Sequence, residues 1–533
     1  MRQCASGSVS QPGYLALLLH AHLPFVRHPE REKFLEESWL FEAITESYLP
    51  LLQILQGWEH DGLPARLTLT LTPTLCSMLL DPLLQERYQR HLKALTGLAE
   101  KEILRTRNEP KFNRLADFYL KRLSALSDLY LNCEGDLVGA FRRLQNGGRL
   151  EIIGCAASHA LLPLLQHPPS VRAQILTGCS HYRACFGRDP SGFWLPECAY
   201  QAGVEPALAE AGVSWFVTES QGILHANPQP RRGVFAPIHT PLGLAAFGRD
   251  QASSKQVWSR QHGYPGDPRY RDFYRDIGFD LDLDYVQACL PTPEIRGFTG
   301  IKYHRVTGKE GAKEIYDRAA ALQAAADHAR HFLESRIEQI RQVSGLLDQP
   351  PILLAPYDAE LFGHWWYEGP EFLDHLVRAA AIGPTPLKML TPGDYLQRHP
   401  AGQLAQPAAS SWGESGDWRV WLNETNAWIY PHLRVAQQRM TQLAQQFPSP
   451  PPLEKRALQQ AARELLLAQS SDWAFLLRTG TSPDYGRKRV TDHLFRFTVL
   501  HEQLTGAGVN ERWLEKIESR DNLFQEVDPQ LWK

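Results

Sequence analysis

Two acidic residues that follow short apolar segments are the candidates for chemistry in this chain. Glu197 comes directly after Phe193–Leu195 and Pro196, and Asp358 comes after Ile352–Ala355. Short, continuous apolar segments are typical of strands buried on both faces of a parallel sheet. Aromatic residues flank both acids, and aromatic rings offer apolar faces on which sugars can stack. Two carboxyl groups at strand ends in an aromatic cleft predict chemistry on glycosidic bonds.

Each acid also has an ordinary structural interpretation. Glu197 could be a surface glutamate in a salt bridge, and Asp358 could cap the helix that follows it, since aspartate is favoured at that position. The appearance of two acids at equivalent positions, each just past an apolar segment, weakens both alternatives.

Three histidines lie at similar positions. His20 and His22 close the first apolar segment, and residues two apart on a strand face the same side of a sheet. His159 follows the segment Leu150–Ile153. These imidazoles could bind sugar hydroxyls, hold a metal ion or pack as structural residues. Two histidines are too few ligands for a metal site, which would need His159 or another third ligand, so sugar binding is the favoured interpretation.

The spacing of apolar segments predicts the fold class. Helical patterns separate them, so the alternation indicates a parallel sheet covered by helices, either as a TIM-like barrel, whole or incomplete, or as an open doubly wound sheet. Eight segments are expected to be strands: Tyr14–Leu19, Leu67–Leu71, Leu150–Ile153, Phe193–Leu195, Trp215–Val217, Leu244–Phe247, Ile352–Ala355 and Leu387–Leu390.

Two regions break this alternation and predict separate domains. Residues 79–144 show only helical patterns and are interpreted as an insertion, which leaves residues 13–78 and 145–400 for the catalytic barrel. Residues 401–533 are interpreted as a helical C-terminal domain entered through a linker at Pro400–Ser411. Its predicted helices are Asn423–Phe447, Leu453–Leu477, Val490–Leu504 and Glu511–Ile517, and a further long helix is predicted at Tyr316–Val343.

Composition excludes several classes of function. A chain of 533 residues with a net charge of -3 is long enough for two or three domains and has no electrostatic reason to bind nucleic acid or an anionic membrane. The 8 cysteines include no C-x-x-C pair, which predicts free thiols and a cytoplasmic protein. No G-x-S-x-G, P-loop or G-x-G-x-x-G motif is present to support serine hydrolase, phosphoryl-transfer or hydride-transfer chemistry.

Five ordered motifs resemble the signature regions of glycoside hydrolase family 57. The C-terminal segments Asn423–Trp428 and Ser471–Trp473 resemble those of the 1,4-alpha-glucan branching enzymes in this family. The five motifs are His20-Ala21-His22-Leu23-Pro24, Gly154–His159, Trp194-Leu195-Pro196-Glu197, Tyr357–Trp365 and Trp412–Trp421.

This resemblance implies an α/β fold with an incomplete (β/α)7 TIM-like barrel, a helical insertion and an all-helical C-terminal domain. It implies a retaining mechanism without a metal or other cofactor, in which Glu197 is the nucleophile and Asp358 the general acid/base. The substrate would be an α-glucan such as amylose or glycogen, and the enzyme is expected to be a monomer. Six further residues would shape the sugar subsites: His20, His22, His159, Trp412, Trp421 and Asp472.

The choice among activities of this family stays open at this point. The helical C-terminal region favours branching, but an α-amylase-like hydrolase or a 4-α-glucanotransferase would use the same fold. In the family's branching enzymes a mobile loop carries a tyrosine that favours transfer, and the best position for it here, Gly222–Pro241, has no tyrosine. A catalytically silent glucan-binding scaffold and a metal-dependent polysaccharide deacetylase are the alternatives from other classes.

Overall fold

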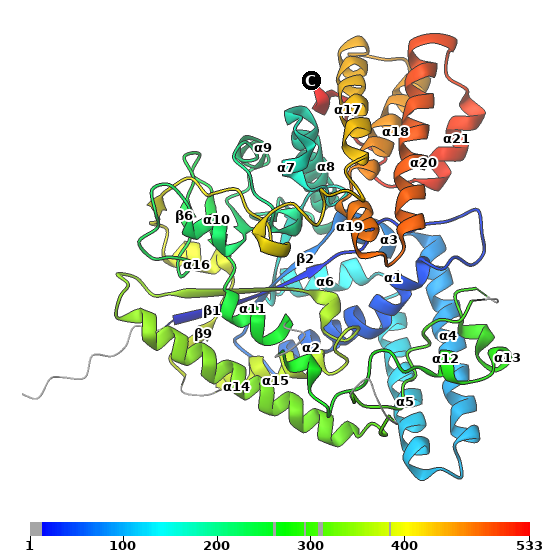
Figure 1. The fold of residues 1–533 in the computed structure, drawn as a ribbon, viewed down its shortest axis with the longest axis vertical. Coiled ribbons are helices and arrows are strands. Elements are labelled where there is room, and N and C mark those ends of the chain that lie inside the picture. Colours follow the sequence, from blue (N-terminus) through cyan, green and yellow to red (C-terminus); the bar gives the residue numbers. More distant parts are fainter. Residues whose placement is uncertain (1–12, 259–262, 293–294, 308–312, 383–384) are drawn as a thin grey trace, which may run out of the picture.

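The sheet at the centre of the molecule contains all eight predicted strands. The computed structural model describes residues 13–258, 263–292, 295–307, 313–382 and 385–533 (Figure 1). Within these residues the strands are β1 Gly13–Ala21, β2 Leu67–Leu71, β3 Leu150–Cys155, β4 Gly192–Trp194, β5 Trp215–Thr218, β6 Ile238–His239, β7 Ala245–Gly248, β8 Ile352–Asp358, β9 Leu387–Met389 and β10 Gln403–Leu404. The two-residue strands β6 and β10 are too short to leave an apolar pattern in the sequence.

The order of the strands is that of an incomplete barrel. Seven parallel strands lie side by side in the order β7-β5-β4-β3-β2-β1-β8, β9 pairs with β1, and β6 and β10 extend the β7 edge. From β1 to β7 the order follows the chain without reversing, whereas a doubly wound sheet reverses its order at a switch point. The prediction of a barrel-like α/β fold is therefore confirmed, and the doubly wound alternative is wrong.

The helices fall into a set around the sheet and a set at the C-terminal end. Asp81 and Asp317 begin the long helices α4 and α14 because their carboxylates accept hydrogen bonds from first-turn backbone amides. The helices that precede residue 400 are α1 Glu37–Ala43, α2 Leu49–His60, α3 Pro73–Leu79, α4 Pro82–Arg105, α5 Pro110–Asn132, α6 Leu137–Asn146, α7 Leu162–Leu165, α8 Pro168–Phe186, α9 Glu205–Glu210, α10 Ser220–Leu224, α11 Gln251–Trp258, α12 Ile277–Asp280, α13 Leu283–Val286, α14 Arg318–Ser344, α15 Gly369–Ile382 and α16 Pro392–Arg398.

The C-terminal helices stand at one end of the molecule, opposite the end from which α4 and α5 project (Figure 1). They are α17 Ile429–Gln446, α18 Pro452–Ala468, α19 Ser471–Thr479, α20 Pro483–Glu502 and α21 Glu511–Arg520. Three of the four helices predicted in this region correspond to α17, α20 and α21, and the domain boundaries themselves stay a prediction. None of the described helices combines the length and the apolar composition that crossing a membrane requires.

Two predictions about local structure are wrong. The predicted helix Leu453–Leu477 is two helices, α18 and α19, because Ser470 leaves the helix to form a bridge with Ala160 in the loop after β3. The stretch Arg249–Asp284 is poor in helical pattern and its sequence predicts a long irregular segment, yet it contains α11. Asp250 stabilises the start of this helix by accepting a hydrogen bond from the Ser253 amide at 2.8 Å.

Strand register brings the predicted site residues to one edge of the sheet. His20 in β1 lies directly across from Asp358 in β8, and Cys155 in β3 lies across from Trp194 in β4. All four strands run in the same direction, so the residues that follow them emerge at the same mouth of the barrel.

A glycine allows one helix to approach the strand end that leads to His159. A Cβ atom at Gly178 in α8 would lie 2.1 Å from the Cys155 carbonyl oxygen at the end of β3. The added Cβ atom is attached to the backbone of α8, and the Cys155 oxygen belongs to the backbone of β3, so neither can move alone. A methyl group could therefore be accommodated only if the helix moved away from the sheet.

We expect Gly178→Ala to destabilise the protein by about 1–3 kcal/mol, because the overlap with backbone exceeds the gain in helix propensity. Gly97→Ala in α4 is the matched control, since a Cβ atom there meets nothing within 4 Å, and it should be neutral or stabilising by up to about 1 kcal/mol. Thermal and urea unfolding of the two variants would measure this difference. Equal stability of both would contradict the close-packing argument.

Candidate active site

A cavity of about 710 Å³ opens at the carboxyl ends of the strands. All eight residues that the sequence analysis predicted for the site line it: His20, His22, His159, Glu197, Asp358, Trp412, Trp421 and Asp472. The catalytic and binding roles of these residues stay predictions, but the chain does bring together side chains from β1, β8, the loops after β3 and β4, and the C-terminal region.

Glu197 is held in an unusual backbone conformation by two neighbouring segments. Its φ of 62° lies in the left-handed region, which costs about 1–3 kcal/mol for a residue other than glycine and which clusters at functional sites. The Trp412 indole N–H donates to its Oε2 at 2.7 Å, and the Ser471 hydroxyl donates to its Oε1 at 2.9 Å. The Glu197 carbonyl also accepts a hydrogen bond from the Trp412 amide at 2.9 Å.

These contacts act on the charge of Glu197. Burial and, more weakly, the negative Asp472 raise the pKa of its carboxyl, while the hydrogen bonds from Trp412 and Ser471 oppose the rise because they stabilise the ionised form; the resulting pKa is about 7. The carboxylate is thus provided with donors on both oxygens, as an anion in a desolvated cavity requires.

Asp358 has the opposite environment. Burial raises the pKa of its carboxyl well above the ordinary value, the negative Glu360 and Glu197 add to the rise, and Arg249 opposes it. Among the described residues none donates a hydrogen bond to the Asp358 carboxyl. Of the two carboxyls, Glu197 is therefore the better stabilised as an anion and Asp358 the better stabilised in its protonated form, which is the division of states that a nucleophile and an acid need.

Three groups form a chain of hydrogen bonds that ends on Glu197. The His20 and His159 Nε2 atoms are 3.0 Å apart, and the His159 Nδ1 atom is 2.9 Å from the Ser471 Oγ atom. Burial lowers the pKa of both histidines well below the ordinary value, so both rings are neutral. Because Ser471 donates its proton to Glu197, His159 must donate from Nδ1 and accept from His20 at Nε2. These hydrogen bonds therefore fix one tautomer for each of the two imidazole rings.

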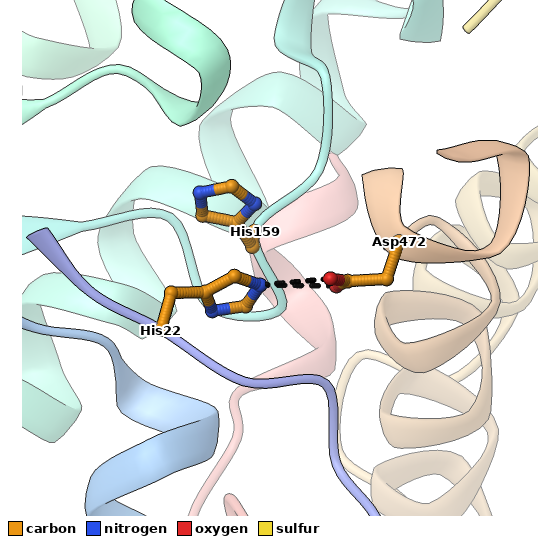
Figure 2. A group of neighbouring side chains, drawn as sticks. All are labelled: His22, His159 and Asp472. Carbon is orange, nitrogen blue, oxygen red and sulfur yellow. Dashed lines mark hydrogen bonds and ion pairs between the residues drawn. The ribbon is translucent and has the colours of Figure 1, made fainter. Parts of the chain in front are cut away.

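His22 differs from the other two histidines because it is paired with an acid. Its Nε2 atom is 3.0 Å from Asp472 Oδ2 (Figure 2). Its Nδ1 atom is 3.0 Å from the Thr72 hydroxyl. Burial lowers the pKa of His22, but Asp472 and, more weakly, Glu197 and Glu360 outweigh it, so the pKa is raised.

The group His22, His159 and Asp472 is compact enough to suggest a metal site, but its ring geometry argues against one. The two imidazole rings are stacked, with centroids 3.8 Å apart and an angle of 18° between their planes (Figure 2). Lone pairs of imidazole nitrogens lie in the ring plane, so the nitrogens of two nearly parallel stacked rings do not converge on one ion. The arrangement suits contacts to a polar ligand at the ring edges.

Several residues of the cavity were not predicted from the sequence. Glu360 lies two residues beyond Asp358 and accepts hydrogen bonds from the His22 amide and the Tyr48 hydroxyl. Arg249 follows the end of β7 and pairs with Glu219 at 2.8 Å. Position just past a strand end is the signal that could have identified Arg249. Ser471 belongs to the segment Ser471–Trp473 that resembles the family, but its contact with Glu197 was not predicted, because it depends on where α19 begins.

Two stretches that are poor in helical pattern, Gly222–Pro241 and Arg249–Asp284, are predicted from the sequence to form lids or walls of the site, and they differ in their relation to the cavity. Arg249 and the α11 residues Ser254, Lys255 and Trp258 line it. The described residues 222–241 contribute no side chain to its wall. They contact the segment 406–410 instead, through the bridge between Asn227 and Gln406 and the close approach of Gly222 to Ser410.

A barrel-like parallel sheet with two buried carboxyl groups in a cavity at the carboxyl ends of its strands has the architecture of an enzyme. The model of glycosyl hydrolase family 57 matches residues 16–407, and the model of the 1,4-alpha-glucan branching enzyme C-terminal region matches residues 432–532. The chain therefore belongs to glycosyl hydrolase family 57, which confirms the resemblance read from the five motifs.

Similar proteins include both branching enzymes and an α-amylase. A 1,4-alpha-glucan branching enzyme from Thermococcus kodakarensis is 32% identical over 97% of this chain and 78% of that protein. The crystal structure of a branching enzyme from Pyrococcus horikoshii matches 98% of this chain and 96% of its own with 31% identity and a TM-score of 0.88. The crystal structure described as a novel alpha-amylase, AmyC, from Thermotoga maritima matches 98% and 99% with 42% identity and a TM-score of 0.92.

We expect Asp472→Asn to lower the pKa of His22, because burial then acts with less opposition. A raised pKa contributes stability below the unfolded value and loses it as pH rises through the folded value, so the variant should lose more stability near about pH 6 than near about pH 9. NMR titration of the imidazole and urea unfolding at both pH values would measure this. Asp484→Asn, at an exposed carboxyl, is the control. An unchanged His22 titration would contradict the pairing.

Proposed function

We propose that the protein is a retaining 1,4-alpha-glucan branching enzyme that cleaves α-1,4 bonds and forms α-1,6 branches in glucans such as amylose and glycogen. The observation that carries the proposal is the contrast between the two carboxyl groups of one cavity. Glu197 accepts hydrogen bonds on both oxygens, whereas Asp358 is buried beside two negative groups. The match of residues 432–532 to the branching enzyme C-terminal model supports the choice of branching.

In the first step Glu197 is the nucleophile. Its carboxylate oxygen attacks the anomeric carbon of the donor glucan while the bond to the glycosidic oxygen breaks. Asp358 gives its proton to that oxygen, so the leaving chain departs as a neutral alcohol and a covalent glycosyl-enzyme remains. The left-handed backbone at Glu197 and its two donors hold the carboxylate in position before the substrate arrives.

In the second step the roles of the two groups reverse. The ionised Asp358 removes the proton from the 6-hydroxyl of an acceptor glucan, and the oxygen attacks the anomeric carbon, which releases Glu197 and leaves Asp358 protonated again. The α configuration is kept because two inversions occur. Water at the same position would give hydrolysis, so the yield of branches depends on sugar occupying the acceptor site.

The remaining residues would bind sugar around this pair. The histidines His20, His22 and His159, with Asp472, present polar edges to the donor sugar, and Trp412 and Trp421 form apolar walls. The proposal includes a catalytic barrel made by residues 13–78 and 145–400, a helical insertion at 79–144 and a helical C-terminal domain at 401–533. It further includes a monomer that takes part in glycogen or starch synthesis in the cytoplasm. The free, buried state of the seven described cysteines supports the cytoplasmic location.

We expect Glu197→Gln to abolish glucan turnover and Asp358→Asn to reduce it by about a hundred- to ten-thousand-fold with the fold intact. Azide should restore turnover of an activated glycoside by Asp358→Asn and give an α-glycosyl azide, because it replaces the acceptor after the glycosyl-enzyme has formed. Steady-state kinetics, circular dichroism and product NMR would measure these effects.

The control for these variants is Glu210→Gln, which removes an exposed carboxylate in a surface ion pair with Arg172 and should leave activity unchanged. A folded Glu197→Gln protein with normal turnover would overturn the nucleophile assignment. A β-glycosyl azide from Asp358→Asn would assign that residue, rather than Glu197, to the nucleophile.

A hydrolase that resembles an α-amylase is the second candidate. Two observations favour it. The described residues 222–241 contain no tyrosine and line no part of the cavity. The 42% identical crystal structure is described as an α-amylase. The two activities differ in which nucleophile, a sugar hydroxyl or water, reaches the glycosyl-enzyme.

Proton NMR of amylose after incubation with the enzyme, together with an assay of reducing ends, would separate the two candidates. We expect a new α-1,6 anomeric signal with few new reducing ends, because the acceptor hydroxyl replaces the bond that was broken. Many reducing ends without the α-1,6 signal would overturn branching in favour of hydrolysis. New α-1,4 chain lengths without either change would indicate a 4-α-glucanotransferase.

A further inference from the structure

A row of aromatic rings, of which three are exposed and two half-buried, begins at the cavity with Trp365. Trp365 lines the cavity, is 55% exposed and stacks on Phe273 with ring centroids 4.6 Å apart. Phe298 lies next to Phe273 at 5.4 Å, and Phe279 lies next to Phe298 at 5.2 Å. Tyr274 packs edge-on against Phe273 at 5.1 Å and is 72% exposed. We call these five residues the aromatic track.

Buried polar groups hold the backbone beneath the aromatic track. The Asp276 carboxylate is almost completely buried and accepts hydrogen bonds from the Gly278, Thr299 and Gly300 amides at 2.8, 3.0 and 2.9 Å. The Thr299 hydroxyl donates to it as well, at 2.7 Å. One carboxylate therefore ties the segment that carries Phe273, Tyr274 and Phe279 to the segment that carries Phe298.

The side chain of Lys302 holds two rings of the aromatic track, those of Phe273 and Phe298. The Lys302 ammonium is buried, lies 4.5 Å from the ring centroids of both Phe273 and Phe298, and donates to the Phe273 carbonyl at 2.6 Å. The Asp272 carboxylate accepts from the Tyr274 amide at 2.8 Å and pairs with Lys313 at 2.6 Å. Cation–π and charge-assisted contacts thus orient the rings while leaving Tyr274 and Phe279 open to solvent.

The exposed rings of the aromatic track are a candidate binding surface. Contiguous apolar patches on soluble proteins mark binding surfaces, because leaving them in water is unfavourable. The aromatic track is continuous with the cavity through Trp365, which belongs to both. A polymer chain that occupies the cavity and is longer than it must leave across a neighbouring surface. Flat rings held in a row suit the apolar faces of successive sugar rings.

We propose that the aromatic track binds the part of an α-glucan chain that extends beyond the cavity. The proposal rests on the proposed function, since it requires an α-glucan in the cavity, and it adds that the enzyme distinguishes long chains from short ones outside the catalytic centre. Binding there holds a polymer at the cavity mouth and raises its occupancy without any change at Glu197 or Asp358.

The test compares a long and a short substrate in variants that spare the cavity. Tyr274→Ala and Phe279→Ala, separately and combined, should raise KM for amylose relative to KM for maltohexaose by about three- to ten-fold, the range expected for loss of aromatic contacts. Phe495→Ala is the matched control, because Phe495 is an exposed phenylalanine, 62% exposed, on α20. Trp365 is left intact because it also lines the cavity.

A binding measurement gives a readout that does not depend on turnover. Each variant is combined with Glu197→Gln, and its migration is followed in native gels that contain glycogen. Retardation should weaken in the Tyr274 and Phe279 variants and stay unchanged in the Phe495 variant. Sedimentation velocity of the same proteins tests a second copy of the chain as the occupant. A dimer that dissociates in the Tyr274 variant, with glycogen retardation unchanged, would overturn the proposal.

The outcomes separate this proposal from the proposed function. If the wild-type protein turns over amylose and the Tyr274 and Phe279 variants keep the wild-type ratio of KM values and the wild-type retardation, the aromatic track is not a glucan surface and the function stands. If the wild-type protein neither turns over nor binds any α-glucan, the function fails, and the aromatic track proposal fails with it.

Discussion

The structure depends on the burial of two carboxyl groups in one cavity that supplies hydrogen-bond donors to only one of them. Desolvation raises the pKa of both Glu197 and Asp358, so burial alone would protonate both. The indole of Trp412 and the hydroxyl of Ser471 distinguish the two, because they stabilise the Glu197 anion. An ionised Glu197 then helps to keep the proton on Asp358. The two donors therefore determine which carboxyl attacks and which protonates.

Both donors come from the C-terminal part of the chain, which makes this part necessary to the cavity. The segment before Trp412 is joined to the loop after β4 by the paired hydrogen bonds of Tyr200 and Ser410, and Ser470 forms a bridge with Ala160 in the loop after β3. These two attachments determine where Trp412 and Ser471 lie. A barrel without them would bury Glu197 with no donor, which is the costly state for a buried carboxylate.

The sequence could predict the site residues that lie at strand ends of the barrel, but not the contacts that the C-terminal part makes with them. Glu197, Asp358 and the histidines could be predicted to lie together because each comes at the end of a continuous apolar strand. The carboxyl ends of parallel strands lie at the same edge of the sheet. The helix break at Ser470 could not be predicted, because residues 453–477 have a continuous helical pattern and the bridge to Ala160 is a tertiary contact. The same limit concealed Ser471, whose position depends on that break. The aromatic track was also missed, because the segments that carry its rings are brought together by tertiary contacts of Asp276 and Lys302.

The carboxyl pair does not determine whether the glycosyl-enzyme reacts with water or with a sugar. Glu197 and Asp358 complete the first step identically for a hydrolase and a branching enzyme, so their protonation states cannot select water or sugar in the second step. Selection must come from surfaces that hold an acceptor chain long enough to exclude water. Trp412 contributes in two ways, because its N–H stabilises Glu197 and its ring lines the cavity. The balance between transfer and hydrolysis therefore rests on aromatic surfaces, while the acid pair supplies the chemistry common to both.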